Sequence, residues 1–138
     1  MQHIIPYLLY EDVGRALQWL ADAFGFRETG ERMTTPEGRI NHAAMEFEGE
    51  LIMMGCPGPQ YKSPKRLGQV TQNLYVNVRD IDRHYERARA AGAEILQPLQ
   101  NMFYGDRRYG AADPEGHHWY FAEPIGKSGG KPSEQQGH

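Results

Sequence analysis

Two adjacent histidines, His117 and His118, follow a tight turn in the segment DPEGHHWYF. An imidazole can bind a divalent metal ion, and near neutral pH it can also take up or release a proton. Strand alternation after the turn places His118 on the same face as Tyr120. The pattern therefore predicts His118 as the candidate catalytic or ligand-contacting histidine, a purely structural role being the commoner alternative. His117 is interpreted as a turn residue.

A charged segment, YGDRRYG, lies just before that turn. Arg107 or Arg108 could clamp a carboxylate or phosphate group with two parallel hydrogen bonds. Alternatively, Asp106 pairs with one of the two arginines and only fixes the loop, which is the interpretation that we favour. Tyr104 and Tyr109 could then line the mouth of a pocket.

The other reactive side chains point to no second site. His84 lies on the buried stripe of a predicted helix, and the strand that carries His42 has no facing that the pattern fixes, so both are interpreted as structural. Cys56 stands where a strand runs into a turn, which disfavours a nucleophilic role. As the single cysteine it cannot form an internal disulfide, which fits a reducing cytoplasm.

The composition of the 138 residues is that of one soluble globular domain, with 39% hydrophobic and 24% charged residues. A net charge of −3 gives the whole molecule no attraction for nucleic acid or for anionic membranes. The longest apolar runs, such as HIIPYLLY, are too short to cross a bilayer, and the first residues lack a signal-peptide pattern. We therefore expect a cytoplasmic protein.

The elements that would position these residues form an internal repeat. Tyr7 matches Tyr75 and Asp12 matches Asp80, each pair lying 68 residues apart. Each half begins with an extended apolar run, continues with helical periodicity from the aspartate, and ends in extended segments broken by glycine turns. The sequence therefore predicts one β-α-β-β-β module in each half and an α+β fold.

The ends of the two predicted helices are marked by residue type. The carboxylates of Asp12 and Asp80 can accept the free amide hydrogens of a first helical turn. Gly25 and Gly92 suit the left-handed residue that closes a helix. The predicted organisation is one structural domain with a first module at 1–56, a linker at 57–69, a second module at 70–124 and a disordered tail at 125–138.

Residues 3–124 resemble the vicinal-oxygen-chelate superfamily, which includes glyoxalase I, extradiol dioxygenases and bleomycin-resistance proteins. The resemblance rests on PYLLYEDVGRALQWLADAFGF and on YGDRRYGAADPEGHHWYFAEP, whose D-P-x-G-H turn is common in bleomycin-resistance-like and glyoxalase-like members. It implies paired βαβββ modules that form a curved mixed sheet around a cleft, and a homodimer with clefts shared between chains. Because this scaffold hosts many chemistries, the resemblance predicts the fold more closely than the activity.

In metal-dependent members of that superfamily, four side chains on the first and last strands of the modules bind one divalent ion. The matching positions here, counted from the capping aspartates and the turn glycines, are Ile5, Met53, Asn73 and Tyr120. None of them supplies the imidazole or carboxylate that such an ion prefers. A register slip of one residue would bring Pro6, Trp119 or Phe121 to these positions, which are no better donors. We therefore expect a member that lacks the metal ligands and carries no cofactor.

The expected cleft is aromatic and apolar, with a few polar groups. Its candidate ligand-binding residues are Tyr7, Met53, Asn73, Tyr75, Asn77, Tyr104, Arg107, His118 and Tyr120. Such a lining suits an organic ligand held by ring contacts and directed hydrogen bonds. Tyr7 and Tyr75 could equally well only fill the space between the sheets.

The sequence thus predicts metal-independent binding of a small, partly aromatic organic molecule, with antibiotic sequestration as one form of that function. The alternative is a lyase, isomerase or dioxygenase that holds a divalent metal ion through non-standard ligands, drawn from His3, His42, Glu46, His118 and Glu123. A third interpretation is an accessory module without a ligand of its own. The expected partners are a small organic molecule and a second copy of the chain, and neither nucleic acid nor a membrane.

Overall fold

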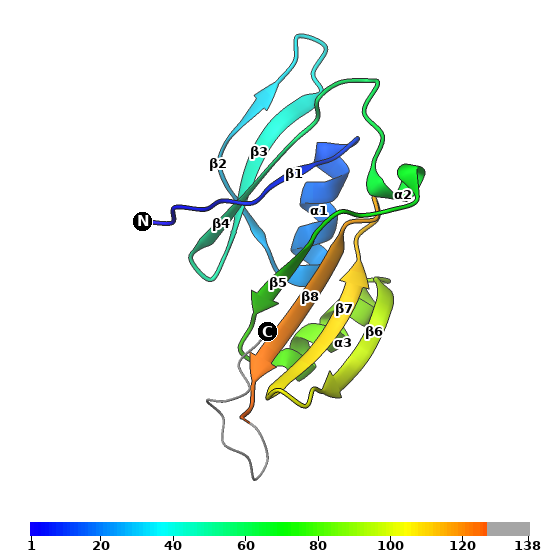
Figure 1. Ribbon diagram of the computed structural model, residues 1–138. Helices are drawn as coiled ribbons and strands as arrows, with labels where there is room; N and C mark the ends of the chain where they lie inside the picture. Colours follow the sequence, from blue (N-terminus) through cyan, green and yellow to red (C-terminus); the bar gives the residue numbers. More distant parts are fainter. Residues whose placement is uncertain (127–138) are drawn as a thin grey trace. The chain divides into compact units, whose positions relative to one another are not determined.

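The structure is a computed structural model that describes residues 1–126. The tail expected at 125–138 therefore lies outside the described residues from position 127 on. The chain divides into two compact units (Figure 1). The first comprises Met1–Gln69 and Pro114–Gly116, and the second comprises Val70–Asp113 and the chain from His117 on.

The first unit contains one βαβββ module. Its elements are β1 (Tyr7–Leu9), α1 (Val13–Phe24), β2 (Arg27–Thr34), β3 (Ile40–Phe47) and β4 (Glu50–Gly55). The strands form one sheet in the order β1-β4-β3-β2, in which β1 runs parallel to β4 and the other neighbours are antiparallel. A single helical turn, α2 (Pro64–Leu67), lies within the segment expected as a linker.

The second unit repeats this plan. Its elements are β5 (Asn73–Asn77), α3 (Ile81–Ala90), β6 (Glu94–Asn101), β7 (Asp106–Ala112) and β8 (His118–Pro124). The sheet order β5-β8-β7-β6 and the single parallel pair, β5 with β8, reproduce the first sheet. The predicted α+β fold with two β-α-β-β-β modules is therefore confirmed.

The helix ends form as their residue types predict. The Asp12 carboxylate accepts the backbone N–H of Arg15 at 3.0 Å, and the Asp80 carboxylate accepts that of Arg83 at 3.3 Å. At the other ends, Gly25 and Gly92 adopt φ values of 80° and 86°, a region that glycine occupies without steric cost.

No helix within residues 1–126 has the length and apolar character needed to cross a bilayer.

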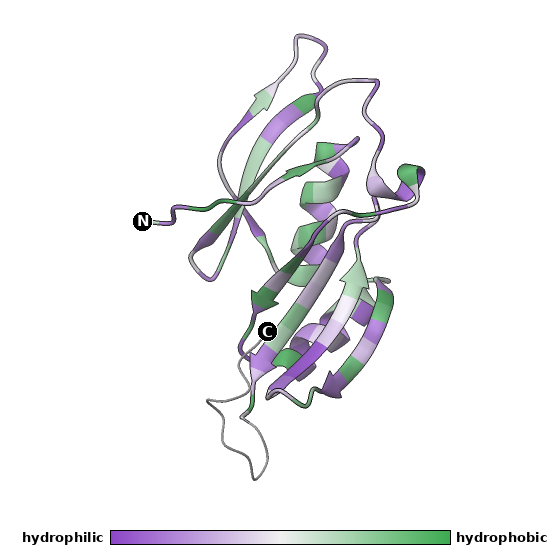
Figure 2. Ribbon diagram, viewed as in Figure 1, coloured by the Kyte–Doolittle hydropathy of each residue, from purple (hydrophilic) through white to green (hydrophobic). Residues whose placement is uncertain are grey.

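Each helix covers one face of its own sheet. The apolar stripe of α1 is buried against β2 and β3, and Figure 2 shows hydrophobic and hydrophilic residues side by side along this helix. The buried residues of α1 are Val13, Ala16, Leu17, Leu20, Ala23 and Phe24. In the second unit, α3 lies over Tyr109, Trp119 and Phe121, which are fully buried. This confirms the predicted strand alternation, with Trp119 and Phe121 on the helix side.

His84 of α3 completes the second core. Its Nδ1 atom lies 2.7 Å from the Tyr109 hydroxyl, and its ring lies 4.3 Å from that of Phe121. His84 is therefore a satisfied helix histidine, as its position on the buried stripe predicted. Burial raises the pKa of the Tyr109 hydroxyl, so this group stays protonated.

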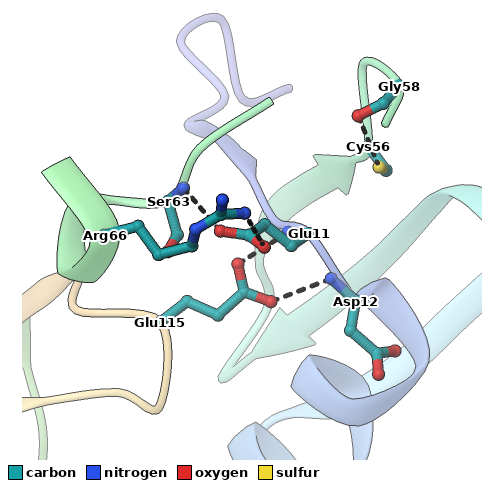
Figure 3. A network of polar contacts seen from close by, with 7 residues as sticks. All are labelled: Glu11, Asp12, Cys56, Gly58, Ser63, Arg66 and Glu115. Carbon is teal, nitrogen blue, oxygen red and sulfur yellow. Dashed lines mark hydrogen bonds and ion pairs between the residues drawn. The ribbon is translucent and has the colours of Figure 1, made fainter. Parts of the chain in front are cut away.

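The turn that precedes β8 contributes a carboxylate to the first unit. Glu115 accepts the backbone N–H groups of Glu11 at 2.6 Å and Asp12 at 2.9 Å, immediately before α1 (Figure 3). Glu11 in turn accepts the Ser63 backbone N–H at 2.8 Å and an Arg66 N–H at 3.0 Å. These charge-assisted hydrogen bonds fix the start of α1 to α2 and to the Pro114–Gly116 turn.

The face of each sheet that is turned away from its helix is called the far face. Because residues paired across strands point to the same side, the register defines its members. On the first sheet they include Tyr7, Leu9, His42, Ala44, Met53 and Gly55. On the second sheet they include Asn73, Tyr75, Asn77, Arg108, Gly110, His118 and Tyr120.

Candidate functional site

The far face of the second sheet carries a hydrogen-bonded group of two tyrosines and one aspartate. The Tyr75 hydroxyl donates to the Asp106 carboxylate at 2.5 Å and is also hydrogen-bonded to Tyr104. Asp106 is only 3% exposed, whereas Tyr75 is 39% exposed. Partial burial, followed by the hydrogen bond to Asp106, raises the pKa of the Tyr75 hydroxyl above its usual value. Tyr75 is therefore a neutral phenol that shields the carboxylate behind it.

Arg108 lies two residues further along β7 on the same face. Its guanidinium carbon lies 5.1 Å from the ring centre of Tyr120 and 6.0 Å from that of Tyr104, both within cation–π range. Its Nη2 donates to the side-chain oxygen of Gln97 at 2.9 Å. The Nε atom is buried and has no hydrogen-bond partner among residues 1–126.

Gly110 provides the space in which the Tyr120 ring lies. A methyl group added at Gly110 would come within 2.5 Å of the Tyr120 Cε1 atom and 2.9 Å of Cδ1. Since the two residues are direct partners across β7 and β8, the ring lies over the glycine backbone and extends toward Arg108. A side chain at position 110 would push the ring away from the guanidinium.

The remaining candidates of the second sheet occupy the same face. Asn73 pairs with His118 in the register, and Asn77 pairs with Ala122. His118 is half-buried, while both asparagines are exposed. His117 lies before the strand, where its backbone N–H donates to Asp113 at 3.0 Å, as expected for a turn residue.

Arg107 is separated from this group by strand alternation. It lies on the helix side of β7, where it pairs with Asp82 at 2.9 Å and with the side-chain oxygen of Asn101 at 2.9 Å. The favoured internal pairing of Asp106 with an arginine is therefore wrong within the described residues: Arg107 takes Asp82, and Arg108 takes Gln97. Asp106 and Arg107 are sequence neighbours, so their side chains point to opposite faces of β7. Arg108 shares the face of Asp106, but there the carboxylate accepts the hydroxyl of Tyr75, whose strand β5 is separated from β7 by β8.

The far face of the first sheet carries a separate pair. The Tyr7 hydroxyl lies 2.7 Å from His42 Nδ1, with ring centres 5.6 Å apart, and Tyr7 is 50% exposed. Met53 lies next to Tyr7 across β1 and β4. Gly55 leaves room for the Tyr7 hydroxyl, because an added methyl group would come within 2.7 Å of it. This sheet thus offers an imidazole–phenol pair beside a thioether.

Metal-ligating side chains do not gather within the described part of the chain. Residues 1–126 contain no group of three or more histidine, cysteine or acidic side chains placed to hold a metal ion. Glu46 forms an ion pair with Arg27 and accepts the Gly49 N–H at 3.1 Å. Glu123 accepts the Ile81 N–H at 3.1 Å at the start of α3. Both carboxylates of the alternative ligand set are thus engaged within the fold.

Similar proteins of known structure share this fold. TioX from Micromonospora sp. ML1 superposes with a TM-score of 0.74 at 37% identity, covering 91% of this chain and 100% of that one. The fosfomycin resistance protein FosX from Listeria monocytogenes, in a structure with Mn(II) and 1S,2S-dihydroxypropylphosphonic acid, gives a TM-score of 0.63 at 14% identity and covers 88% and 89% of the two chains. At that identity the likeness is one of fold.

Comparison of the sequence with family models and with other proteins identifies the superfamily of this chain. The model described as the Glyoxalase/Bleomycin resistance protein/Dioxygenase superfamily matches residues 1–121. An uncharacterized protein of Mycobacterium bovis is 33% identical over 125 residues, which is 87% of this chain and 82% of that protein. The chain belongs to the glyoxalase/bleomycin resistance protein/dioxygenase superfamily, as its resemblance predicted. Membership supports a role in binding or modifying a small molecule.

The sequence left several contacts of the candidate site unidentified. His42 could not be placed on a face, although Ala43 and Met45, which are buried, have the opposite parity. The contact of Gln97 with Arg108 could not be predicted, because Gln97 lies between two register shifts in the pairing of β6 with β7. Tyr109, which was expected at the mouth of a pocket, is instead fully buried on the helix side. Strand alternation from Tyr109 places Arg108 on the far face, in place of the Arg107 that was chosen from the sequence.

Proposed function

We propose that this protein binds a small, partly aromatic organic molecule on the far face of the second sheet, without a metal ion. The observation that carries the proposal is the arrangement of Tyr104 and Tyr120 around Arg108, with Tyr75 hydrogen-bonded to Tyr104 on the same face. Tyrosine rings give large apolar contact at a low cost in side-chain entropy, and their hydroxyls direct hydrogen bonds. His118, Asn73 and Asn77 extend the polar rim of the same face.

Metal independence is supported by the side chains at the four positions where metal-dependent members carry ligands. Ile5, Met53, Asn73 and Tyr120 provide an alkyl group, a thioether, an amide and a phenol. A divalent ion of the first transition row binds such a set poorly compared with imidazoles and carboxylates. Binding through rings and hydrogen bonds requires no such ion.

Sequestration of an aromatic antibiotic is the form of this function that we favour. A protein that sequesters a drug lowers its free concentration by binding alone, so a ring-lined face with directed hydrogen bonds is sufficient. We further propose a homodimer in the cytoplasm. The exposed Tyr7 and Leu9 supply apolar surface for a second copy, and the free thiol of Cys56 suits a reducing compartment.

The test is a ligand screen followed by one pair of variants. Thermal shifts across a panel of aromatic metabolites and antibiotics, measured in the presence of a chelator, identify compounds that stabilise the folded chain. Tyr120→Ala should weaken the binding of a hit by about tenfold, as truncation of an aromatic anchor does. Tyr85→Ala is the matched control, because this tyrosine is half-buried on the helix side beside Tyr109.

Equal affinity in Tyr120→Ala and in the native protein would refute this placement of the site. A panel without any stabilising compound would instead favour an accessory module that has no ligand of its own.

The second candidate function is a metal-dependent lyase, isomerase or dioxygenase, and the Tyr7–His42 pair favours it. A phenol hydrogen-bonded to one ring nitrogen orients the imidazole, as partners of metal-bound histidines do. Metal analysis of protein purified without chelator distinguishes the two functions. Stoichiometric Zn, Ni, Mn or Fe that survives dialysis and is lost in His42→Ala would favour the enzyme and overturn metal-independent binding.

A further inference from the structure

Arg108 differs from the neighbouring arginine in having no carboxylate partner within the described part of the chain. Arg107 forms an ion pair with Asp82 at 2.9 Å, whereas the only hydrogen bond of Arg108 among residues 1–126 goes to the neutral amide oxygen of Gln97. A partly buried guanidinium that no carboxylate contacts is in an unfavourable environment, which an anionic ligand would improve. Its cationic charge is therefore available to a bound molecule.

The surroundings of Arg108 fix the direction from which such a molecule can approach. The Nε atom is buried, while Nη2 is held by Gln97. The Nη1 atom has no hydrogen-bond partner among residues 1–126 and is not buried, so it is open to solvent. The Tyr104 and Tyr120 rings hold the guanidinium plane by cation–π contacts, so the Nη1 donors are aimed before a ligand arrives.

Asp106 sets the orientation of the ligand. Its carboxylate lies on the same face two residues away, a separation of about 7 Å along a strand. It is buried and accepts the Tyr75 hydroxyl at 2.5 Å, so the Tyr75 side chain lies between this charge and the exposed surface. An anionic group is thus attracted to the Arg108 end, while the Asp106 end presents the exposed ring of Tyr75.

From this arrangement we infer that the ligand is a planar aromatic anion. Its carboxylate or enolate oxygen accepts hydrogen bonds from Arg108 Nη1, and its ring lies against Tyr75 and Tyr120. This inference rests on the proposed binding function and adds the charge and orientation of the ligand. The net charge of −3 would by itself favour a cationic compound, so the inferred preference for an anion depends on the local position of Arg108.

The experiment compares two probes of the same shape, 2-naphthoate and the neutral 2-naphthamide, by calorimetric titration at low ionic strength and neutral pH. We expect the native protein to bind the naphthoate at least about tenfold more tightly, the difference typical of a hydrogen bond between charged groups. Arg108→Gln should remove that preference, so that this variant binds the naphthoate and the naphthamide with equal affinity. Arg107→Gln removes the same charge from the other face and should retain the preference.

Three results would overturn the inference. Equal affinity of the native protein for both probes would refute it, and because this comparison needs no variant, it holds even if Arg108→Gln fails to fold. Loss of the preference in Arg107→Gln as well as in Arg108→Gln would show a general charge effect instead of a site. In both cases the proposed function survives, and binding of neither probe would refute the inference while the proposed function is decided by the panel screen and by Tyr120→Ala.

Discussion

The substitution Gly110→Ala tests whether the Tyr120 ring is positioned by the absence of a side chain beneath it. The new methyl carbon would lie 2.5 Å from Cε1 of Tyr120, whereas two carbon atoms in contact prefer about 3.5 Å, so the ring must move by about 1 Å. Gly110 does not have a positive φ, so its backbone accepts an alanine. The effect therefore comes from the ring alone.

The magnitude follows from two opposing terms. Forcing an extra methyl group into a packed site costs about 1–3 kcal/mol. Replacing glycine by alanine also restricts the unfolded chain, which offsets about 0.4–1 kcal/mol. We expect a net loss of about 1–2 kcal/mol in the free energy of unfolding, together with weaker binding of aromatic ligands because Tyr120 no longer lies over Arg108.

Chemical denaturation of a double-mutant cycle measures this effect. In the Tyr120→Ala background the ring is absent, so Gly110→Ala should cost nothing there, and the coupling energy should equal the cost in the native background. The same cost in both backgrounds would refute the reasoning, because the destabilisation would then come from the strand and not from the ring.

Three further outcomes are expected. Asp12→Ala should lower the free energy of unfolding by about 1 kcal/mol in chemical denaturation, because the Arg15 N–H loses its acceptor, and an unchanged stability would contradict the cap. The hydrogen bonds from Ser63, followed by Arg66, lower the pKa of the Glu11 carboxyl in the folded chain. The contribution of Glu11 to the free energy of unfolding is therefore present above its unfolded pKa of about 4.5 and is lost as the pH falls through the lower folded value. Glu11→Gln should flatten this acid dependence of the free energy of unfolding. The raised pKa values of Tyr75 and Tyr109 predict that at least two of the eight tyrosines stay protonated in a spectrophotometric alkaline titration of the folded chain below its unfolding pH. Tyr75→Phe should therefore leave the number of titrating tyrosines unchanged.

The local elements could be predicted from the sequence because each depends on neighbouring residues. Asp12 and Asp80 cap their helices through N–H groups three residues away, and Gly25 takes the left-handed conformation directly after α1. The 68-residue repeat indicated that the second half must repeat the first, and the sheet orders agree with this. The facing of Trp119 and Phe121 followed from a period of two.

The contacts of the candidate site could not be predicted in the same way, because they join strands that are distant in sequence. Tyr75 and Asp106 are 31 residues apart, and Tyr7 and His42 are 35 apart. Their meeting depends on the β5-β8-β7 and β1-β4-β3 strand orders and on the register of each pair. A register change of one residue would turn Arg108 toward α3 and Arg107 toward the tyrosines.

The sequence by itself determined the two modules, their helices and the side-chain types at the positions where related proteins hold a metal ion. These are properties of composition and of short-range periodicity, which the chain carries before it folds. Only the tertiary structure decided which arginine faces the tyrosines and which carboxylate Tyr75 covers. That choice depends on hydrogen-bonded register between strands, which is settled when the sheets assemble and their helix-facing residues are buried.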